Sequence, residues 1–231
     1  MTLPHTDRAQ RLRASPPVFR SPFLDRFTRV HPAVPVLLYG PVVVLLAVLA
    51  LARLKPATFV GDCVLGYGAW TLTEYWVHRA VFHFSPRGPW GERLHWVMHG
   101  IHHDHPNDPR RLVMPPLASL PIIGSPVGVM LLVLGAGHGS AAATGYVAGY
   151  VVYDELHFHL HHDSPSTALG RRLRNHHLRH HFQDDSRGFG ISCPYWDHVF
   201  ATAPKRRAPA NRPCGARCRP EARSRFTSRR I

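Results

Sequence analysis

Long uncharged stretches alternate with polar, histidine-rich segments along this chain. The first stretch contains 20 uncharged residues from Ala33 to Ala52, mostly Val, Leu and Ala. At 1.5 Å per residue, a helix of this length measures about 30 Å, which is the thickness of the hydrocarbon core of a bilayer. After a short break at Arg53 and Lys55, a second apolar stretch runs from Ala57 to Val77. The pattern predicts two membrane-spanning helices joined by a short turn.

A longer apolar run follows in the second half of the chain. The 42 residues from Leu112 to Tyr153 contain no Asp, Glu, Lys or Arg, which is enough for two spans. The glycine-rich segment Gly135–Ser140 offers a turn in the middle. A large soluble helical core is the alternative, but soluble domains seldom contain such a run. We therefore expect an all-α integral membrane protein with four transmembrane helices in two hairpins, at about 33–53, 57–78, 114–135 and 140–158.

The distribution of charge indicates how these helices are oriented. The 231 residues include 28 Lys and Arg against 14 Asp and Glu, and the net charge of +14 suggests at first a nucleic-acid-binding protein. However, residues 1–30 carry six basic and two acidic side chains, residues 204–231 carry ten and one, and the middle is nearly neutral. Basic ends beside membrane spans mark the cytosolic side. We expect cytosolic termini, no nucleic-acid partner, and a tail attracted to anionic lipids.

The same features divide the chain into three parts. Residues 1–32 are expected to form a basic cytosolic segment, and residues 33–203 a membrane domain. Residues 204–231 form a basic tail that lacks apolar periodicity, which predicts disorder. Four spans with cytosolic ends also place the polar segments 79–111 and 159–203 in the cytosol. These two segments form the predicted helical, histidine-rich cap of the membrane domain.

The 19 histidines outnumber all acidic residues together, so their positions need an explanation. Ten of them fall into four groups near the predicted cytosolic ends of the spans, spaced H-x4-H, H-x2-H-H, H-x3-H and H-x2-H-H. Residues three or four apart share a helix face, so each such group can point together, whereas the H-x4-H pair requires the second span to end between its members. The ten are His78, His83, His99, His102, His103, His157, His161, His177, His180 and His181.

Ten imidazoles exceed what one metal ion binds, so the groups predict two ions, each with about five nitrogen ligands and an open position. Such ligands suit iron, zinc, copper or nickel, and open positions on redox iron suit oxygen chemistry. An exposed basic patch and an adventitious or storage metal site are the alternatives. An apolar groove between the spans is expected to open at the cytosolic interface. A ligand imidazole usually donates its other ring N–H to a nearby acceptor, and the candidates for this role are Glu74, Tyr153, Asp154 and Asp197.

Further short motifs accompany the histidines. The set comprises Glu74-Tyr-Trp-Val-His78-Arg-Ala-Val-Phe-His83, His99-Gly-Ile-His102-His103, Arg111-Leu-Val-Met-Pro-Pro116, Tyr153-Asp154, His157, His161, His177-Leu-Arg-His180-His181, Gly188-Phe-Gly190 and Trp196-Asp197. Over roughly residues 60–203, this set resembles the membrane fatty acid hydroxylase superfamily of sterol desaturase-like di-metal enzymes. The segments Arg111–Pro116 and Gly188–Asp197 are similar to its fatty acid 2-hydroxylase branch.

The resemblance implies that the ten histidines bind two iron ions, which zinc can replace in purified protein, and that dioxygen is a co-substrate. It implies a di-iron monooxygenase that hydroxylates a long fatty acyl chain at carbon 2, either free or within a sphingolipid. Residues 1–32 are too short for the cytochrome-type haem domain of eukaryotic relatives. We therefore expect a separate ferredoxin- or cytochrome-type electron donor with its reductase, and a bacterial inner membrane rather than the endoplasmic reticulum.

Two other classes of function remain open at this point. One is a carotenoid ring hydroxylase or a sterol-type oxidase of the same superfamily, which would share the ligand pattern. The other is a non-enzymatic membrane protein that binds or transports metal, which would place its ligands near the bilayer midplane. The histidines here lie at one predicted membrane face, which counts against transport.

Overall fold

The computed structural model describes residues 5–205, and every regular element in that range is a helix. The tail predicted for residues 204–231 lies almost wholly outside the described residues. In chain order, the elements are α1 (His5–Arg13), α2 (Pro22–Arg26), α3 (Val34–Leu51), α4 (Pro56–Trp76), the π-helix η1 (Val77–Phe82), α5 (Pro89–His95), the π-helix η2 (Trp96–Gly100), α6 (Ile101–Asp104), α7 (Pro116–His162), α8 (Ala168–Phe182) and α9 (Tyr195–Val199).

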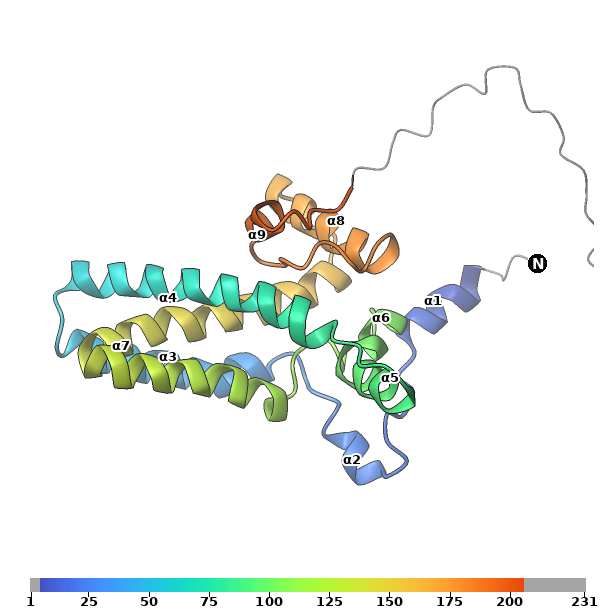
Figure 1. The fold of residues 1–231 in the computed structure, drawn as a ribbon, viewed down its shortest axis with the longest axis horizontal. Coiled ribbons are helices and arrows are strands. Elements are labelled where there is room, and N and C mark those ends of the chain that lie inside the picture. Colours follow the sequence, from blue (N-terminus) through green and yellow to red (C-terminus); the bar gives the residue numbers. More distant parts are fainter. Residues whose placement is uncertain (1–4, 206–231) are drawn as a thin grey trace, which may run out of the picture.

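The four segments predicted as spans are helical, and they form the long part of the molecule (Figure 1). The helices α3 and α4 correspond to the first two segments, and α7 contains the other two as separate arms. The arms meet at Gly135, where φ is 76° and ψ is 176°. Only glycine adopts this backbone readily, so one residue makes the reversal for which we expected a six-residue turn. By length and apolar composition, α3 and α7 are able to cross a membrane.

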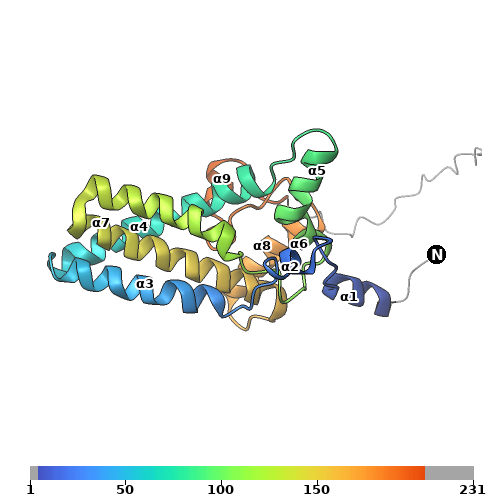
Figure 2. The same cartoon turned by 90° about the horizontal axis from the view of Figure 1, so that it is seen from below.

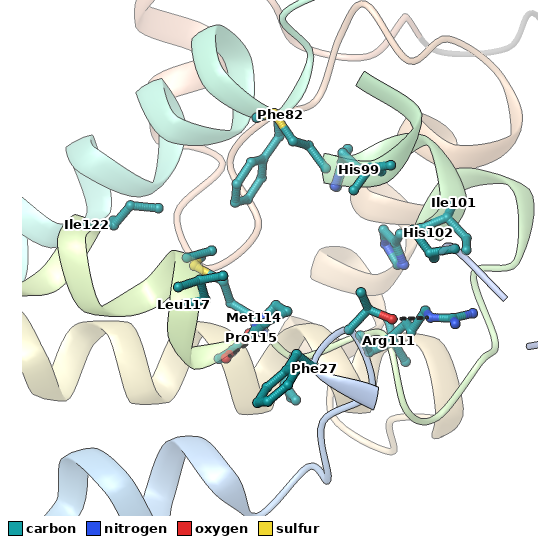
Figure 3. A pocket seen from close by; sticks show the side chains of 18 of the residues that line it. Phe27, Phe82, His99, Ile101, His102, Arg111, Met114, Pro115, Leu117 and Ile122 are labelled. Atoms are coloured by element: carbon teal, nitrogen blue, oxygen red, sulfur yellow. Dashed lines mark hydrogen bonds between the residues drawn. The ribbon is translucent and has the colours of Figure 1, made fainter. Parts of the chain in front are cut away.

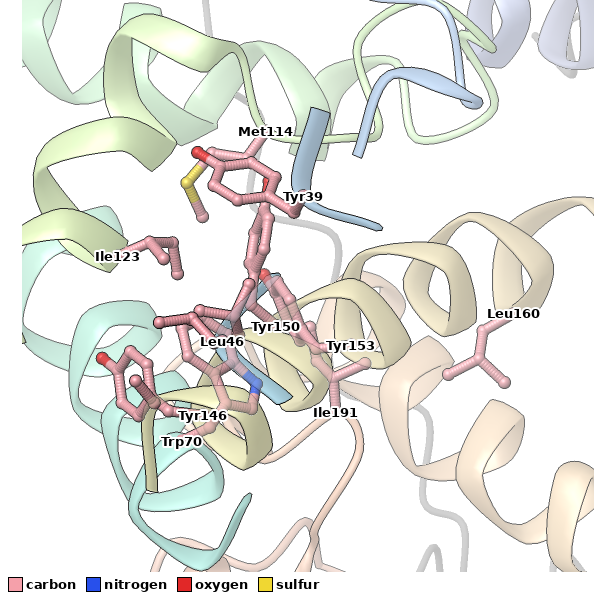
Figure 4. Packing of buried hydrophobic residues seen from close by; sticks show 12 residues of the cluster. Tyr39, Leu46, Trp70, Met114, Ile123, Tyr146, Tyr150, Tyr153, Leu160 and Ile191 are labelled. Carbon is pink, nitrogen blue, oxygen red and sulfur yellow. The ribbon is translucent and has the colours of Figure 1, made fainter. Parts of the chain in front are cut away.

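The helices α3, α4 and both arms of α7 lie side by side (Figure 2). Aromatic side chains hold them together (Figure 4). The ring of Trp70 lies edge-on against Tyr146 and Tyr150, with centroids 5.4 and 5.3 Å away. The ring centroids of Tyr39, on α3, and Tyr150 lie 4.9 Å apart. The Tyr39 hydroxyl forms a hydrogen bond of 2.8 Å with the hydroxyl of Ser119, in the first arm. Such pairs stabilise by about 0.5–1.5 kcal/mol each beyond the area that they bury. The aromatic core thus fixes four helical segments relative to one another.

Glycines bring α4 and the second arm of α7 into direct backbone contact. A Cβ atom added at Gly66 would lie 1.9 Å from the carbonyl oxygen of Ala142. One added at Gly145 would lie 1.9 Å from the carbonyl oxygen of Cys63. Small residues at helix crossings are typical of membrane proteins, where close backbone approach replaces hydrophobic burial as the source of packing energy.

The outer faces of the long helices are covered by large apolar side chains. Leu65 is 72% exposed and Leu132 is 87% exposed, and they have many exposed Val and Leu neighbours. A continuous apolar surface of this kind indicates contact with something other than water. Together with the length of α3 and α7, it is consistent with a lipid environment.

The short helices α5, α6, α8 and α9 form a cap at one end of the bundle, and α1 lies at the same end (Figure 1). Buried Arg111 fastens the N-terminal segment to this cap. Its guanidinium lies 3.2 Å from the Asp25 carboxylate and donates to the carbonyl oxygen of Pro16 at 2.6 Å. The N–H of Val30 also donates to the carbonyl oxygen of Arg110 at 2.7 Å. The histidine groups lie between this cap and the ends of α4 and α7.

Candidate metal centre

Two π-helical turns position the first histidines of the centre. In η1, the N–H of His83 donates to the carbonyl oxygen of His78 at 3.2 Å, which sets the two residues one turn apart on the same face. The expectation that the second span ends between them, with His83 bending back, was therefore wrong in its geometry. The helix continues past His78 in wider turns and ends at Phe82, with His83 as its C-cap. In η2, a second π-turn carries His99.

The ten predicted ligands converge in two groups of five (Figure 3 shows two of them at a cavity). Within each group, one nitrogen from every imidazole lies within 4.8 Å of all the others. We name these groups cluster A and cluster B. Cluster A contains His78, His83, His99, His103 and His180. Cluster B contains His102, His157, His161, His177 and His181.

Each H-x2-H-H motif contributes to both clusters, which the sequence analysis did not anticipate. His99 and His103 belong to cluster A, whereas His102 between them belongs to cluster B. The C-terminal motif is the mirror case, with His180 in cluster A and its two neighbours in cluster B. Consecutive residues on a helix point about 100° apart, so a helix that lies between two sites can serve both.

The distances inside the clusters match a bound metal ion. His180 Nε2 lies 3.1 Å from His83 Nε2 and 3.2 Å from His103 Nε2. In cluster B, His102 Nε2 lies 3.1 Å from the Nε2 atoms of both His157 and His181. Metal–nitrogen bonds of about 2.0–2.1 Å put ligands at right angles about 3 Å apart, and ligands at tetrahedral angles about 3.4 Å apart. The observed separations of 3.1–3.2 Å lie between these two values, so they fit imidazoles that share one metal ion.

Backbone carbonyls fix the orientation of two imidazoles in cluster A. The Nδ1 of His78 donates to the carbonyl oxygen of Phe189 at 2.8 Å, and the Nδ1 of His180 to that of Arg187 at 2.7 Å. A neutral imidazole has one N–H, so the Nε2 of each of these two carries a lone pair that faces the other nitrogens. Lone pairs that converge on one point repel unless a cation lies between them. The donor set therefore fits a metal ion.

Burial keeps these histidines neutral and able to bind. Loss of hydration in the cap, with a smaller contribution from the neighbouring His180, lowers the pKa of His83 to about 3 and that of His103 to about 2. Protons therefore do not compete for their ring nitrogens near neutral pH. The same burial would make an imidazolium costly, which favours the metal-binding form.

The predicted carboxylates hold backbone rather than ligand imidazoles. Glu74 accepts hydrogen bonds from the N–H groups of Ile191 and Ser192 at 2.6 and 2.8 Å. Asp154 accepts from the N–H of Met114 at 3.1 Å and from the Tyr150 hydroxyl at 2.9 Å. Within residues 5–205, neither carboxylate bonds one of the ten imidazoles, so the predicted contact is corrected for both. Each is engaged by backbone donors near the centre.

Asp197 and Tyr153 also lie close to the clusters without bonding a ligand nitrogen. Burial raises the pKa of Asp197, but hydrogen bonds from His176, the Gly190 N–H and the Thr202 hydroxyl outweigh it and hold the pKa below its usual value. The ring of Tyr153 stacks on His157, with centroids 6.0 Å apart and planes at 21°. Sequence reasoning missed the carbonyls of Arg187 and Phe189, for which the flanking glycines were the available signal.

An apolar cavity of about 570 Å³ opens onto both clusters. It reaches His99 of cluster A and His102 and His157 of cluster B, and its walls come from η1, η2, α2 and the start of α7 (Figure 3). Phe82 lines it and stacks on His99, with centroids 5.2 Å apart. The predicted apolar groove thus has a counterpart next to the centre.

A second cavity, of about 430 Å³, lies beside a different part of the centre. It touches His103 of cluster A and His181 of cluster B, and it is lined on the other side by α1, including Arg8 and Arg11. In the described part of the chain, both clusters therefore adjoin an apolar cavity and a polar cavity, whose wall carries Arg8, Arg11 and the carboxylate of Asp104.

Known proteins share this arrangement of motifs and helices. The family model described as fatty acid hydroxylase matches residues 63–202, which include all ten histidines. Two dihydroceramide fatty acyl 2-hydroxylases of Arabidopsis thaliana are 39% and 37% identical to the chain. The first alignment covers 63% of this chain and 62% of the relative, and the second covers 85% and 84%. The solved structure of full-length scs7p, in which only the hydroxylase domain is visible, gives a TM-score of 0.73 at 34% identity, over 82% of this chain and 73% of that chain.

Proposed function

Because this chain belongs to the fatty acid hydroxylase family, we propose that it is a membrane-bound monooxygenase that hydroxylates a long fatty acyl chain at carbon 2. The observation that carries this proposal is the apolar cavity that ends on ligands of both histidine clusters. Carbon 2 is proposed because the relatives from Arabidopsis thaliana are named 2-hydroxylases. The acyl chain is either free or part of a sphingolipid, since those relatives are named for dihydroceramide.

The ten histidines are proposed to hold two iron ions, five ligands to each. Five imidazoles exceed the four ligands typical of zinc and would suit iron better, although zinc binds imidazole well enough to replace iron in purified protein. When bound, the two irons supply the reductive activation of dioxygen. Overall, one C–H bond of the acyl chain, O2, two electrons and two protons give one C–OH group and one water molecule.

The protein positions the acyl chain and excludes water. The walls of the apolar cavity bury the chain next to His99 and His102, with its tail directed toward Ile122 (Figure 3). Phe82 and Tyr153 stack on ligand imidazoles from both clusters, so they fix the rings and form part of the apolar wall of the cavity. Asp154 holds the backbone at Met114, which lines the same cavity. The substrate is thereby oriented before any chemistry occurs.

We further propose that α3, α4 and the two arms of α7 span the membrane with the cap in the cytosol. The exposed apolar faces of these helices and the basic ends of the chain support this orientation. On this proposal, residues 33–203 form the hydroxylase domain, residues 1–32 a cytosolic segment and residues 204–231 a cytosolic tail. The choice of a bacterial inner membrane over the endoplasmic reticulum stays a prediction.

The two electrons are proposed to come from a separate ferredoxin- or cytochrome-type protein with its reductase. The second cavity supports a place for it, because Arg8 and Arg11 line an opening onto the ligands His103 and His181. A donor with an acidic surface would be attracted there, and its electrons would enter through imidazoles that the acyl cavity does not occupy.

The test is expression of the full chain in a host that lacks 2-hydroxy fatty acids, followed by mass spectrometry of hydrolysed lipids. The chain is expected to produce 2-hydroxy acids, and the His102→Ala/His103→Ala variant none, since one ligand is lost from each cluster. The control is His198→Ala, an exposed histidine outside both clusters, which should keep full activity. Undiminished 2-hydroxy product from the double variant at normal protein level would overturn the proposal. Hydroxylation of a ring lipid instead of an acyl chain would do so as well.

A further inference from the structure

The two clusters differ in the hydrogen-bond partners of the imidazole Nδ1 atoms, which face away from the converging Nε2 atoms. In cluster A, the backbone carbonyls of Phe189 and Arg187 accept the Nδ1–H groups of two ligands, His78 and His180. In cluster B, none of the five Nδ1 atoms has a hydrogen-bond partner among the described residues, and all five are buried. This difference is not visible in the sequence, where both clusters have the same number of histidines.

The carbonyls behind cluster A belong to a loop that is held rigidly. Asp197 is fully buried, and each of its carboxylate oxygens accepts two hydrogen bonds. Oδ1 accepts from the Phe189 N–H at 2.9 Å and from the Thr202 hydroxyl at 2.8 Å. Oδ2 accepts from the Gly190 N–H and from His176 Nε2, both at 2.9 Å. Asp197 therefore fixes the peptide groups on both sides of the Phe189 Cα, and the second of these contains the Phe189 carbonyl.

Glycines allow this loop to lie where it does. Gly188 has φ of +80°, which other residues adopt only with strain. A Cβ atom at Gly190 would lie 2.5 Å from the carbonyl oxygen of Cys193 and 3.1 Å from Asp197 Oδ2. Glu74 binds the next two N–H groups, those of Ile191 and Ser192. The loop 187–192 is thus tied down at successive positions.

An acceptor behind a ligand imidazole fixes its tautomer and ring orientation and makes its other nitrogen more basic. Loss of such a partner typically lowers metal affinity 10- to 100-fold. Cluster A has two partners of this kind and cluster B has none within residues 5–205. The rings of cluster B are held by packing and by each other.

We propose that the two halves of the centre are inequivalent: cluster A binds its metal ion more tightly and fills first, and Asp197 is the positioning residue that sets this affinity through the loop 187–192. This inference rests on the proposed metal centre. It assigns Asp197 a role at one metal site only, although Asp197 contacts no ligand imidazole itself.

The first experiment is a competition titration of the metal-free full-length protein with Zn²⁺ against a chromophoric chelator. Two binding steps that differ at least about 10-fold in affinity are expected. Cluster variants assign the steps. His157→Ala/His161→Ala should keep the tight step and lose the weak one, and His78→Ala/His83→Ala should do the reverse. Two steps of equal affinity, or the opposite assignment, would overturn the inference while leaving the proposed function intact. No zinc binding at all would instead overturn the proposed function.

The second experiment is the same titration with Asp197→Asn. An amide can accept at one position only, so the NH2 group would face two hydrogen-bond donors and the loop would lose its anchor. We expect the tight step to weaken 10- to 100-fold and the weak step, whose ligands His177 and His181 share α8 with His176, to weaken much less. The control is Asp163→Asn, which removes the same charge from an exposed residue whose side chain bonds only His159. It should change neither step.

A purely structural role of Asp197 would predict a different result. If Asp197→Asn weakened both steps equally, or left both unchanged, the inference would be wrong. Should this variant fail to fold, Thr202→Val removes just one of the four hydrogen bonds to Asp197. A smaller weakening, confined to the tight step, is then expected, and an equal effect on both steps refutes the positioning role.

Discussion

The crossing of α4 and α7 at Gly66 gives the sharpest prediction for the fold. In Gly66→Ala, the new Cβ would lie 1.9 Å from the carbonyl oxygen of Ala142, a backbone atom that cannot rotate away. Side-chain Cβ atoms essentially never approach other atoms within 3.0 Å. The two helices must therefore separate by roughly 1 Å or more at this point.

Two effects of opposite sign determine the outcome. Replacing glycine by alanine inside a helix stabilises it by up to about 1 kcal/mol. Overpacking of a close contact costs about 1–3 kcal/mol, and separation of the helices also weakens the neighbouring contact of Gly145 with Cys63. We expect net destabilisation of about 1–2 kcal/mol. Since α4 leads to His78 and α7 carries His157, a shift of this size should also disturb both clusters, and misplacement by about 1 Å can cost 100-fold in rate.

Gly68→Ala is the matched control on the same helix, because nothing lies within 4 Å of a Cβ atom at that position. Both variants would be purified in the same detergent. Thermal unfolding followed by circular dichroism, and metal bound per chain, would then be compared. Gly66→Ala should unfold at a lower temperature and hold less metal, whereas Gly68→Ala should match or exceed the parent protein. Equal unfolding temperatures and metal contents would refute the close crossing.

Three further predictions concern pH, the N-terminal segment and the acyl cavity. The half-buried His83 and His103 have pKa values lowered from 6.5 to about 3 and about 2, so between these values and pH 6.5 the unfolded chain binds protons that the folded chain does not. The metal-free protein should therefore lose stability as pH falls below about 6.5, by up to about 1.4 kcal/mol per pH unit for each histidine. Asp25→Ala leaves buried Arg111 without its partner at 3.2 Å and should speed tryptic cleavage of the N-terminal segment. Ile122→Trp fills the cavity beside the proposed acyl tail and should shift products to shorter chains.

Each of these predictions has its own control. Thermal unfolding that does not change between about pH 8 and 5 would contradict the first. Asp163→Ala, which removes an exposed carboxylate outside the N-terminal segment, should leave the rate of cleavage unchanged, and an equal acceleration would contradict the second. Leu120→Trp, on the same helix but exposed and outside the cavity, should leave chain lengths unchanged. A shift equal to that of Ile122→Trp would contradict the third.

The helices were predictable from sequence because their signal is local. A run of 42 residues without Asp, Glu, Lys or Arg has few alternatives to long buried or lipid-facing helices, and the structure places α7 across it. Helix α3 extends from Val34 to Leu51, and its ends lie within two residues of the ends of the first predicted span, 33–53. The reversal at Gly135 was narrower than expected, because one glycine in a backbone conformation closed to other residues replaces a turn.

The composition of the clusters was predictable, but their partition was not. Spacing indicates which histidines share a helix face, and all ten predicted ligands do converge. It does not indicate that η1 and η2 are π-helical, because such wide turns form only where tertiary contacts favour them. The spacing of histidines also cannot reveal that the Phe189 carbonyl accepts a hydrogen bond from a ligand. Every residue has a backbone carbonyl, and only the fold decides which one faces an imidazole. The carboxylates were recognised as important, but they bind the backbone.

The two H-x2-H-H motifs differ from the other histidine pairs in what they connect. The histidine pair at η1 and the pair on α7 each belong to a single cluster. In contrast, His102 and His180 each belong to the cluster that does not contain the rest of their own motif. As a result, α6 contributes to the cluster that α7 and most of α8 build, and α8 contributes to the one built by η1 and η2. Neither helix can shift without changing the geometry of both clusters. The second histidine of each H-x2-H-H motif therefore connects its helix to the other cluster, so α6 and α8 each couple the two halves of the centre.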